Sequence, residues 1–370
     1  MKIGIDARMF GPTVGGGGLG RYVEQLVTEL QANDHKNRYV LFLKKENIHA
    51  CKITNPNFEK RLADIHWYTL EEQLTFGRIV DRESLDIIHF PHWNVPVALK
   101  TPFIVTIHDL ILLEEPHSSK VTTRNIFVFL LKYFGYKLVL SHAIRASKKI
   151  IAVSHATADV IQRFFPTISK DKIDIQYEGV TPLPSLSQSF PISASHNLLY
   201  IGNAYPHKNL ERLLEAFAII QQTHPDTELT LAGTESTFYK RLLAKSRDHV
   251  TFVPNPTDKK LTELLKQTTL FVFPSRIEGF GLPPLEAMHA GVPVAASDIP
   301  SLREILDDSA VFFPPNNPTE IARAITDILD HPTRRKELIA HGLEHIKRFS
   351  WKTMAINIAS LYETCGKETP

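Results

Sequence analysis

Short apolar runs alternate with helical patterns along nearly the whole chain, and this alternation limits the possible folds more than any other feature. The runs are rich in Ile, Val, Leu and Phe, which is typical of strands buried on both faces of a parallel sheet. Helical patterns such as 210–221, 258–266 and 301–306 lie between them. The first set of predicted strands is 2–6, 39–43, 65–68, 87–90, 103–108, 150–154 and 173–177. The second set is 198–201, 229–232, 250–253, 270–273, 292–296 and 311–313. The pattern predicts an α/β protein with two Rossmann-like, doubly wound parallel sheets.

A Pro- and Ser-rich stretch without periodicity, 181–191, separates the two sets and is typical of a linker. The chain has 370 residues, which is too long for one compact core and suits two domains. We therefore predict an N-terminal domain over 1–183 and a C-terminal domain over 184–351, facing each other across a cleft. Ligands of such sheets bind at the carboxyl ends of the strands.

Composition and charge exclude several classes of protein. The formal net charge of +2 is far below the basic footprint of a nucleic-acid binder. Cys51 and Cys365 are isolated, which suits a reducing compartment and excludes a cysteine-based zinc site. The N-terminus enters a strand-like run at once, and no apolar stretch reaches the roughly 18 residues of a spanning helix. We expect a cytoplasmic protein.

The stretch 270–286 carries the strongest chemical signal. A buried-strand pattern, Leu-Phe-Val-Phe, leads into a glycine-rich loop, and a helix opens soon after it with two prolines at its start. Loop N–H groups and a helix N-terminus form an anion site. Two carboxylates, Glu278 and Glu286, flank this loop, and Arg276 lies beside them. Carboxylates accept hydrogen bonds from hydroxyls while N–H groups hold phosphate, so the pattern predicts a nucleotide-sugar site. Taken singly, Glu286 could merely cap the helix and Glu278 could be a solvated loop acid.

A glycine run, 15–20, precedes a helix that continues to about Leu30. It formally matches the dinucleotide fingerprint, but that fingerprint follows its strand directly, whereas eight residues separate Gly15 from Asp6. The interpretation we favour is a flexible loop over a cleft, whose N–H groups approach a phosphate or an acceptor closely. The alternative is a mobile loop without a ligand.

Two further residues stand at predicted strand ends. His108 ends the run 103–108, where an imidazole can donate to a sugar hydroxyl or an oxyanion. Lys208 lies just before a helix that Asn209 is expected to cap, so its ammonium complements a diphosphate. The alternatives are a satisfied strand-edge histidine and an ordinary surface lysine.

The stretch 124–149 mixes aromatic and basic residues. It predicts either an interfacial membrane helix or, as the commoner case, a packed helix with a solvated basic face.

Together these motifs resemble the large retaining glycosyltransferase family four, which has the GT-B fold. The resemblance covers nearly the whole chain, from the glycine run before Arg21-Tyr22 to Thr-Ile-His-Asp at 106–109, Val153-Ser154, Gly202 with Lys208-Asn209, and Ser-Arg-Ile-Glu-Gly-Phe-Gly-Leu-Pro at 275–283. Phe349-Ser350-Trp351 is similar to the family's entry into a closing helix, which implies that 352–370 returns to the first domain. The resemblance further implies that the domain 1–183 binds the acceptor and the domain 184–351 binds the nucleotide-sugar donor.

The resemblance also implies roles for particular residues. His108 would contact the donor sugar near the reacting carbon, and Glu278 would contact its hydroxyls; these are the predicted catalytic residues. Glu286 would bind the ribose. The remaining predicted donor-binding residues are Gly16, Gly17, Gly18, Asn203, Lys208, Arg276, Gly279, Phe280, Gly281 and Leu282. Many family members carry arginine where this chain has Asn203, and Arg276 or His207 is the candidate to supply that charge.

The expected activity is retaining transfer of a hexose from a nucleotide diphosphate sugar to a glycan or lipid-linked hydroxyl, without a metal or other cofactor. The pattern is most similar to mannosyl- and rhamnosyltransferases of polysaccharide assembly, which favours GDP-mannose; UDP-glucose and dTDP-rhamnose are the alternative donors. A nucleotide-sugar epimerase and a non-catalytic binding subunit remain alternatives, while a dehydrogenase lacks its glycine motif.

Overall fold

A computed structural model describes residues 1–116, 126–181, 196–244 and 248–367, and the chain forms two compact units. The first unit holds 1–110, 126–179 and 350–367. The second holds the described part of 180–349 together with 111–116. Most of the predicted linker 181–191 lies outside the described residues.

The first unit is built on a seven-stranded sheet in the order β3-β2-β1-β4-β5-β6-β7, and every pairing is parallel. The side chains of β1, β4 and β5 are almost wholly buried, because helices cover both faces of the sheet. The strands are β1 (Lys2–Asp6), β2 (Arg38–Leu43), β3 (Phe58–Leu62), β4 (Ile87–Phe90), β5 (Phe103–Ile107), β6 (Lys149–Ala152) and β7 (Ile173–Ile175). The helices are α1 (Pro12–Gly15), α2 (Gly17–Asn33), the π-helix η1 (Glu72–Phe76), α3 (Gly77–Asp81), α5 (Ile126–Ala146), α6 (His155–Phe164), the short η2 (Lys170–Lys172) and α14 (Trp351–Lys367).

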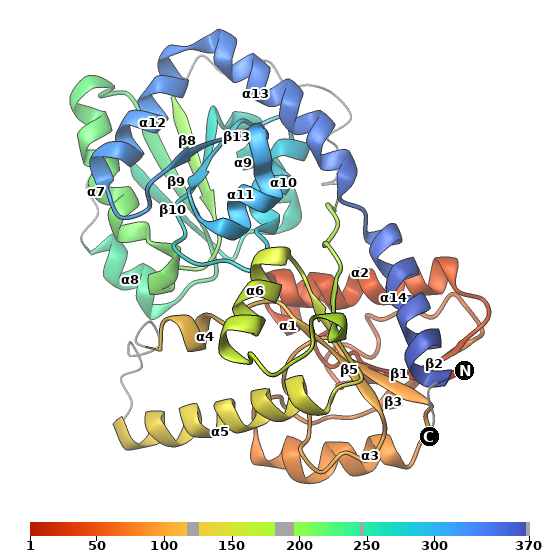
Figure 1. Ribbon diagram of the computed structural model, residues 1–370. Coiled ribbons are helices and arrows are strands. Elements are labelled where there is room, and N and C mark those ends of the chain that lie inside the picture. Colours follow the sequence, from red (N-terminus) through yellow and green to blue (C-terminus); the bar gives the residue numbers. More distant parts are fainter. Residues whose placement is uncertain (117–125, 182–195, 245–247, 368–370) are drawn as a thin grey trace. The chain divides into compact units, whose positions relative to one another are not determined.

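The second unit has a six-stranded parallel sheet in the order β10-β9-β8-β11-β12-β13. Helices α7 and α12 pack side by side on it (Figure 1). The strands are β8 (Asn197–Ile201), β9 (Glu228–Gly233), β10 (Val250–Pro254), β11 (Leu270–Phe273), β12 (Val294–Ser297) and β13 (Ala310–Phe313). The helices are α4 (Ile111–Glu114), η3 (Pro206–Lys208), α7 (Leu210–Thr223), α8 (Thr237–Leu243), α9 (Asp258–Gln267), α10 (Leu282–His289), α11 (Pro300–Leu306), η4 (Asp307–Ser309), α12 (Pro318–Asp330), α13 (Pro332–His345) and η5 (Ile346–Arg348).

One predicted strand is wrong. The apolar run 65–68 is a loop, and the third strand is instead β3, whose sequence is Phe-Glu-Lys-Arg-Leu. β3 lies at the edge of the sheet and pairs only with β2, so it carries the charges that keep an exposed edge from pairing with another chain. Such a strand lacks the apolar signature of the central ones.

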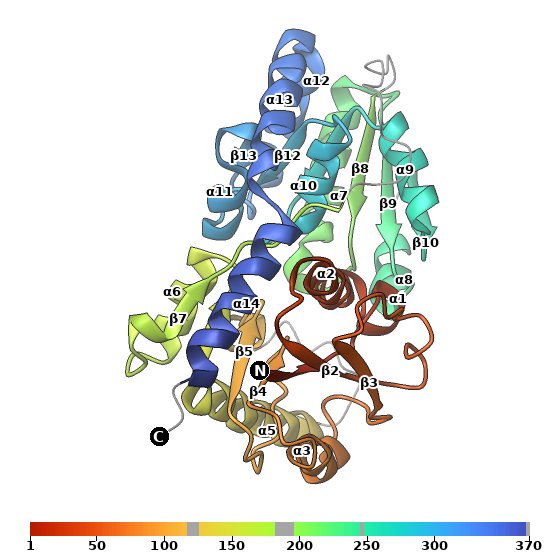
Figure 2. The same ribbon diagram turned by 90° about the vertical axis from the view of Figure 1, so that its right-hand side faces the viewer.

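The end of the chain completes the first unit. Helix α14 packs on α2, so the first and last long helices of the chain lie together (Figure 2). The chain leaves and re-enters the unit at neighbouring points, because a Cβ on Gly179 would lie 2.2 Å from the backbone nitrogen of Trp351. From α14 the wholly buried Tyr362 reaches His89 on β4: Tyr362 Oη is 2.7 Å from His89 Nδ1. His89 Nε2 lies 2.8 Å from Thr106 Oγ1 on β5.

This buried histidine makes the first unit sensitive to acid. Burial lowers the pKa of His89 to about 3, so the folded protein keeps the ring neutral while the unfolded chain takes up a proton below about 6.5. The contribution of the neutral His89 ring to the free energy of unfolding is therefore fully present above pH 6.5, and it is lost as the pH falls toward 3. For His89 alone we expect a loss of about 2 kcal/mol in the free energy of unfolding between pH 7 and pH 5.

Urea unfolding followed by tryptophan fluorescence measures this loss, because Trp67, Trp93 and Trp351 all lie in the first unit. His89→Gln keeps a donor and an acceptor but cannot titrate, and it should flatten the pH dependence by about the same 2 kcal/mol. An equal pH dependence in the variant and the parent would contradict this role of His89.

Candidate active site

The strongest predicted motif lies at the point where the strand order of the second sheet reverses. The chain runs from β8 outward to β10, then returns to β11 on the other side of β8. The loops after β8 and β11 therefore diverge from neighbouring strands, and ligands of doubly wound sheets bind at such a switch point. Lys208 lies in the first of these loops and Glu278 in the second.

Lys208 and Glu278 form an ion pair across the switch point. Lys208 Nζ donates to Glu278 Oε1 at 2.5 Å, and both side chains are largely buried. The ammonium also lies 5.7 Å from the centre of the Phe273 ring, at the end of β11. A cation and an acid are thus held beside each other, and each retains hydrogen-bonding capacity beyond the shared bond.

The glycine-rich loop ends at the start of α10. Gly281 is the residue before the helix and has φ of 101°, and a Cβ there would lie 2.8 Å from Leu302, so glycine is required. Pro283 and Pro284 follow Leu282 and have no N–H to offer. The donors that this helix start presents to an anion are therefore the N–H groups of Gly281 and Leu282. Gly279 and Phe280 precede them in the loop.

The two loops are joined by backbone and side-chain hydrogen bonds. The backbone N–H of Arg276 donates to the carbonyl of His207 at 2.8 Å. Asn209 Nδ2 donates to the carbonyls of Pro274 at 3.0 Å and Pro315 at 2.7 Å. Asn209 does precede α7, but it has φ of 62° and its side chain makes no cap bond. The expectation that it caps the helix is wrong, because its amide is used to tie the loops together.

Arg276 is anchored within the second unit. Its Nη2 lies 3.0 Å from Glu115 Oε2, which comes from the short segment 111–116. Three buried polar groups at the ends of β11 and β12 have no hydrogen-bond partner among the residues that the structure describes: Ser275 Oγ, Arg276 Nε and Ser297 Oγ. Unsatisfied buried groups of this kind are rare in proteins, and they fit a site that receives polar ligand atoms or water.

The structure distinguishes between His207 and Arg276, the two candidates to supply the positive charge that many family members have at position 203. His207 is buried, and burial together with the nearby Lys208 lowers its pKa to about 4, so the ring is neutral at pH 7. Arg276 is permanently charged and therefore remains as the candidate. Asn203 itself shapes the loop, since its carbonyl accepts from Tyr200 Oη at 2.7 Å and its Oδ1 accepts from the backbone N–H of Tyr205 at 3.2 Å.

Glu286 is buried as the fifth residue of α10. A glutamate that completes a capping box occupies the third position, so its place in the helix does not match the capping alternative.

In the first unit the glycine run spans the junction of two helices. Gly16 lies between α1 and α2 with φ of 75°, and Gly16, Gly17 and Gly18 are exposed at the N-terminal end of α2. Gly20 is packed so tightly that a Cβ would lie 2.2 Å from the carbonyl oxygen of Gly11. The run is therefore not the loop that we predicted, because it forms the end of α1 and the first turn of α2. Its three exposed glycines lie at a helix start, which suits an anion.

His108 follows β5, and both its ring nitrogens have partners. Nε2 lies 2.9 Å from the carbonyl oxygen of Pro91, so it carries a hydrogen and donates. Nδ1 lies 3.0 Å from Oε1 of the buried Glu178, and a proton on either residue completes that bond. Tyr22 packs edge-on against the imidazole, with the ring centres 4.7 Å apart. For His108 to donate to a sugar hydroxyl, its hydrogen bond to Pro91 or its hydrogen bond to Glu178 has to break.

The predicted site residues thus form two groups. The second unit brings together Lys208, Arg276, Glu278 and the N–H groups of 279–282, with Asn203 in the same loop as Lys208. The first unit holds His108 and the glycines 16–18. Sequence reasoning missed Glu178, although a glutamate and a glycine directly after the predicted strand 173–177 were an available signal.

In the described part of the chain no group of three or more His, Cys, Asp or Glu side chains is placed to hold a metal ion. None of the described helices is both long and apolar enough to cross a lipid bilayer.

Comparison with known proteins gives a family for this arrangement. Residues 16–182 match the model of Glycosyltransferase Family 4, and residues 164–345 match that of Glycosyl transferases group 1. The O-antigen chain mannosyltransferase B of Escherichia coli is 28% identical over 75% of this chain and 74% of its own. The O-antigen chain mannosyltransferase RfbU of Salmonella typhimurium is 23% identical over 82% of this chain and 80% of its own.

Among solved structures, the sucrose-phosphate synthase of Thermosynechococcus elongatus superposes with a TM-score of 0.78 at 21% identity, covering 100% of both chains. At that identity the likeness shows the fold alone. Two parallel Rossmann-like sheets, the Lys208–Glu278 pair at a switch point and the two family models agree: this chain is a glycosyltransferase of family four, with the GT-B fold.

Proposed function

We propose that the protein transfers mannose from GDP-mannose to a hydroxyl of a glycan or lipid-linked acceptor, with retention of the anomeric configuration. The observation that carries this proposal is the Lys208–Glu278 ion pair beside the glycine-rich start of α10. A diphosphate needs cations and N–H donors, while a sugar needs acceptors for its hydroxyls, and these chemistries meet here. The choice of mannose rests on the similarity to the two O-antigen chain mannosyltransferases.

The residues of the second unit suit a reaction whose leaving group is a diphosphate. As the bond between the anomeric carbon and the phosphate oxygen breaks, negative charge develops on that oxygen. The Lys208 ammonium and the N–H groups of Gly281 and Leu282 can stabilise this charge without moving. Such preorganised electrostatic stabilisation is the largest single contribution to the rate enhancement of many enzymes. Arg276 would contribute a further permanent charge.

The acceptor hydroxyl oxygen forms a bond to the anomeric carbon on the face that the diphosphate leaves. The hydroxyl proton passes to a phosphate oxygen of the departing GDP. Glu278 then serves to hold sugar hydroxyls rather than to form a covalent intermediate. These groups require no metal, and we propose a metal-independent reaction.

We also propose that α5 contacts an anionic lipid surface, at the inner face of the membrane. Leu131 and Phe134 are 73% and 68% exposed, and Leu130 and Leu138 continue the same apolar surface. Lys132 and Lys137 are exposed beside them. Apolar side chains flanked by lysines suit the boundary between acyl chains and anionic headgroups. Binding to vesicles that contain an anionic lipid should weaken in Phe134→Ser; undiminished binding would exclude this helix.

A panel of donors tests the proposed activity. GDP-mannose, UDP-glucose, dTDP-rhamnose and NAD are each added to the protein, and the cognate donor should raise the melting temperature by mass action. We expect the largest shift with GDP-mannose. NMR of the product formed with an acceptor glycan then gives its anomeric configuration, which should be that of the donor.

Each contrary outcome removes a defined part of the proposal. A larger shift with UDP-glucose or dTDP-rhamnose would replace the donor. Release of free GDP without need of an acceptor would favour an epimerase-type reaction. Binding of GDP-mannose without any turnover would favour a non-catalytic subunit, and an inverted product would exclude retention.

A further inference from the structure

The first sheet has a switch point of its own, and a buried charged network lies there. β1 and β4 are neighbours from which the chain departs in opposite directions. Arg8, just after β1, is 1% exposed, and its guanidinium donates to both carboxylate oxygens of Asp6, at 2.8 Å and 2.7 Å. It also donates to Glu72 Oε1 at 2.6 Å and lies 3.7 Å from the centre of the Phe76 ring. Burying one cation and two acids costs free energy that hydrogen bonds only partly offset, so the arrangement needs a reason.

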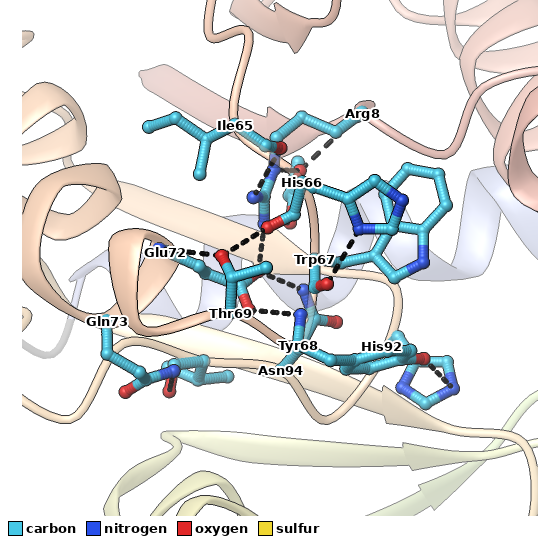
Figure 3. A network of polar contacts seen from close by, with 12 residues as sticks. Arg8, Ile65, His66, Trp67, Tyr68, Thr69, Glu72, Gln73, His92 and Asn94 are labelled. Carbon is cyan, nitrogen blue, oxygen red and sulfur yellow. Dashed lines mark hydrogen bonds and ion pairs between the residues drawn. The ribbon is translucent and has the colours of Figure 1, made fainter.

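The network holds one surface loop in place (Figure 3). Glu72 Oε2 accepts from the backbone N–H of Tyr68 at 2.8 Å, and its Oε1 accepts from Asn94 Nδ2 at 2.6 Å. Arg8 Nη1 donates to the carbonyl of Ile65 at 3.3 Å. The segment 65–72, which leads into η1, is thereby fixed to the residues that follow β1 and β4.

Tyr68, at the centre of this loop, is strained and yet half-exposed. Its φ of 62° is in the left-handed region, which glycine or asparagine normally occupies, and the residue is 51% exposed. A bulky residue keeps such a conformation only where its surroundings force it, and strained residues cluster at functional sites. Here the hydrogen bonds of the network hold the backbone of Tyr68 in the left-handed conformation, while its ring faces outward.

The Tyr68 ring belongs to an ordered aromatic surface. It stacks on Trp93, with ring centres 4.8 Å apart and planes 18° apart. His92 Nδ1 accepts from the backbone N–H of Trp93 at 2.8 Å, so Nε2 carries the hydrogen that points to Tyr68 Oη at 3.4 Å. The phenol then accepts from His92 and keeps its own proton to donate. On the other side, the His92 ring lies 6.2 Å from that of His108.

We propose that Tyr68, Trp93 and His92 form a platform for the acceptor sugar, with the Arg8–Glu72 network as its positioning support. This inference rests on the proposed function and deepens it. Aromatic faces are electron-rich and attract the C–H faces of a pyranose ring, while a hydroxyl and an imidazole at the rim orient its hydroxyl groups. Arg8, the one cation of the network, is buried between Asp6 and Glu72. Its charge is therefore not available to a phosphate group at the surface. A neutral sugar therefore suits it better than a nucleotide.

A binding experiment tests the platform without relying on catalysis. The sequence has three tryptophans, so the full-length protein labelled with 15N at the indoles should give three side-chain resonances. Methyl α-D-mannopyranoside is titrated first, followed by the methyl glycosides of glucose, galactose, rhamnose and N-acetylglucosamine. We expect at least one of them to shift the Trp93 resonance, which Trp93→Phe identifies, and to leave that of Trp351 in place.

Tyr68→Gly removes the ring and also relieves the left-handed strain, which offsets part of the stability lost with the stacking on Trp93, so the variant should remain folded with a melting temperature close to that of the parent. It should lose the response of Trp93 and raise the KM for the acceptor about tenfold, with the KM for the donor unchanged. Tyr68→Phe keeps the stacking and should show a smaller rise. Phe164→Ala, on α6, is the matched control, since it truncates another partly exposed aromatic side chain of the first unit.

Three results would overturn the platform. The first is an unmoved Trp93 with every glycoside. The second is a Tyr68→Gly variant that retains the full glycoside response. The third is a Tyr68→Gly variant that loses anionic-vesicle binding but keeps glycoside binding, which would make the aromatic surface a lipid contact. Failure of the donor panel would leave the glycoside titration interpretable, because donor and platform residues lie in different units.

Discussion

Lys208→Ala should lower the rate of sugar transfer by about two to three orders of magnitude. The ammonium is the charge closest to Glu278 at the second switch point, and the proposed reaction depends on stabilising the departing diphosphate. Because this interaction strengthens as the bond breaks, the loss should fall mainly on kcat rather than on the KM for the donor. Steady-state kinetics with GDP-mannose and an acceptor glycan measure both constants.

The matched control for this variant is Lys260→Ala. Lys260 is an exposed lysine on α9 in the same unit, and its pairing with Glu263 at 3.5 Å is solvent-exposed. Its loss should leave transfer unchanged. Lys208→Arg keeps the charge and should retain more activity than the alanine variant. If Lys208→Ala remained folded and transferred sugar at the parent rate, the diphosphate would have to bind elsewhere.

Arg8→Ala should lower the free energy of unfolding of the first unit by about 3–5 kcal/mol. The change leaves Asp6 and Glu72 buried beside each other without their cation, and removing one partner of a buried ion pair is far costlier than removing an exposed one. Urea unfolding monitored by tryptophan fluorescence reports this unit specifically. Arg61→Ala, which removes a more exposed arginine paired with Glu83 and Glu59, should cost at most about 1 kcal/mol.

The effect of Arg8→Ala should depend on pH. Burial already raises the pKa of Glu72, and Arg8 opposes that rise, so the variant should raise the pKa further. A carboxyl whose folded pKa exceeds its unfolded value favours folding when protonated, and this stabilisation is lost as the pH rises through the folded pKa. The difference between variant and parent should therefore be smaller at pH 5 than at pH 7. A difference that grew on acidification would contradict the buried-acid explanation.

The sequence predicted the central parts of the fold better than its margins. β1, β4 and β11 begin and end where their apolar runs do, because strands buried on both faces must be apolar throughout. β3 was missed because an edge strand carries charged side chains instead of a continuous apolar run. The apolar run 65–68 was mistaken for it. The aromatic residues of that run do not belong to a strand. They lie in the loop that the buried Arg8 network supports, where Tyr68 stacks on Trp93.

Site prediction shows the same division. Lys208 and Glu278 could be predicted to meet because each follows an apolar strand, and the carboxyl ends of adjacent parallel strands share one edge of the sheet. The partners of His108 and Arg8 could not be found in this way. Glu178 and Glu72 lie 70 and 64 residues from them in sequence, and no local pattern ties such pairs together. An acid at the end of a buried strand and an arginine two positions later, Asp6 and Arg8, were the one signal available.

The return of the chain to its first unit has a consequence for biosynthesis. On the ribosome, the strands β1 to β7 emerge long before α14, which supplies the partner of His89. The second unit ends at residue 349 and can complete its sheet while that final helix is still being synthesised. Until α14 has been synthesised, the nascent N-terminal sheet therefore leaves a histidine and its flanking core open to water.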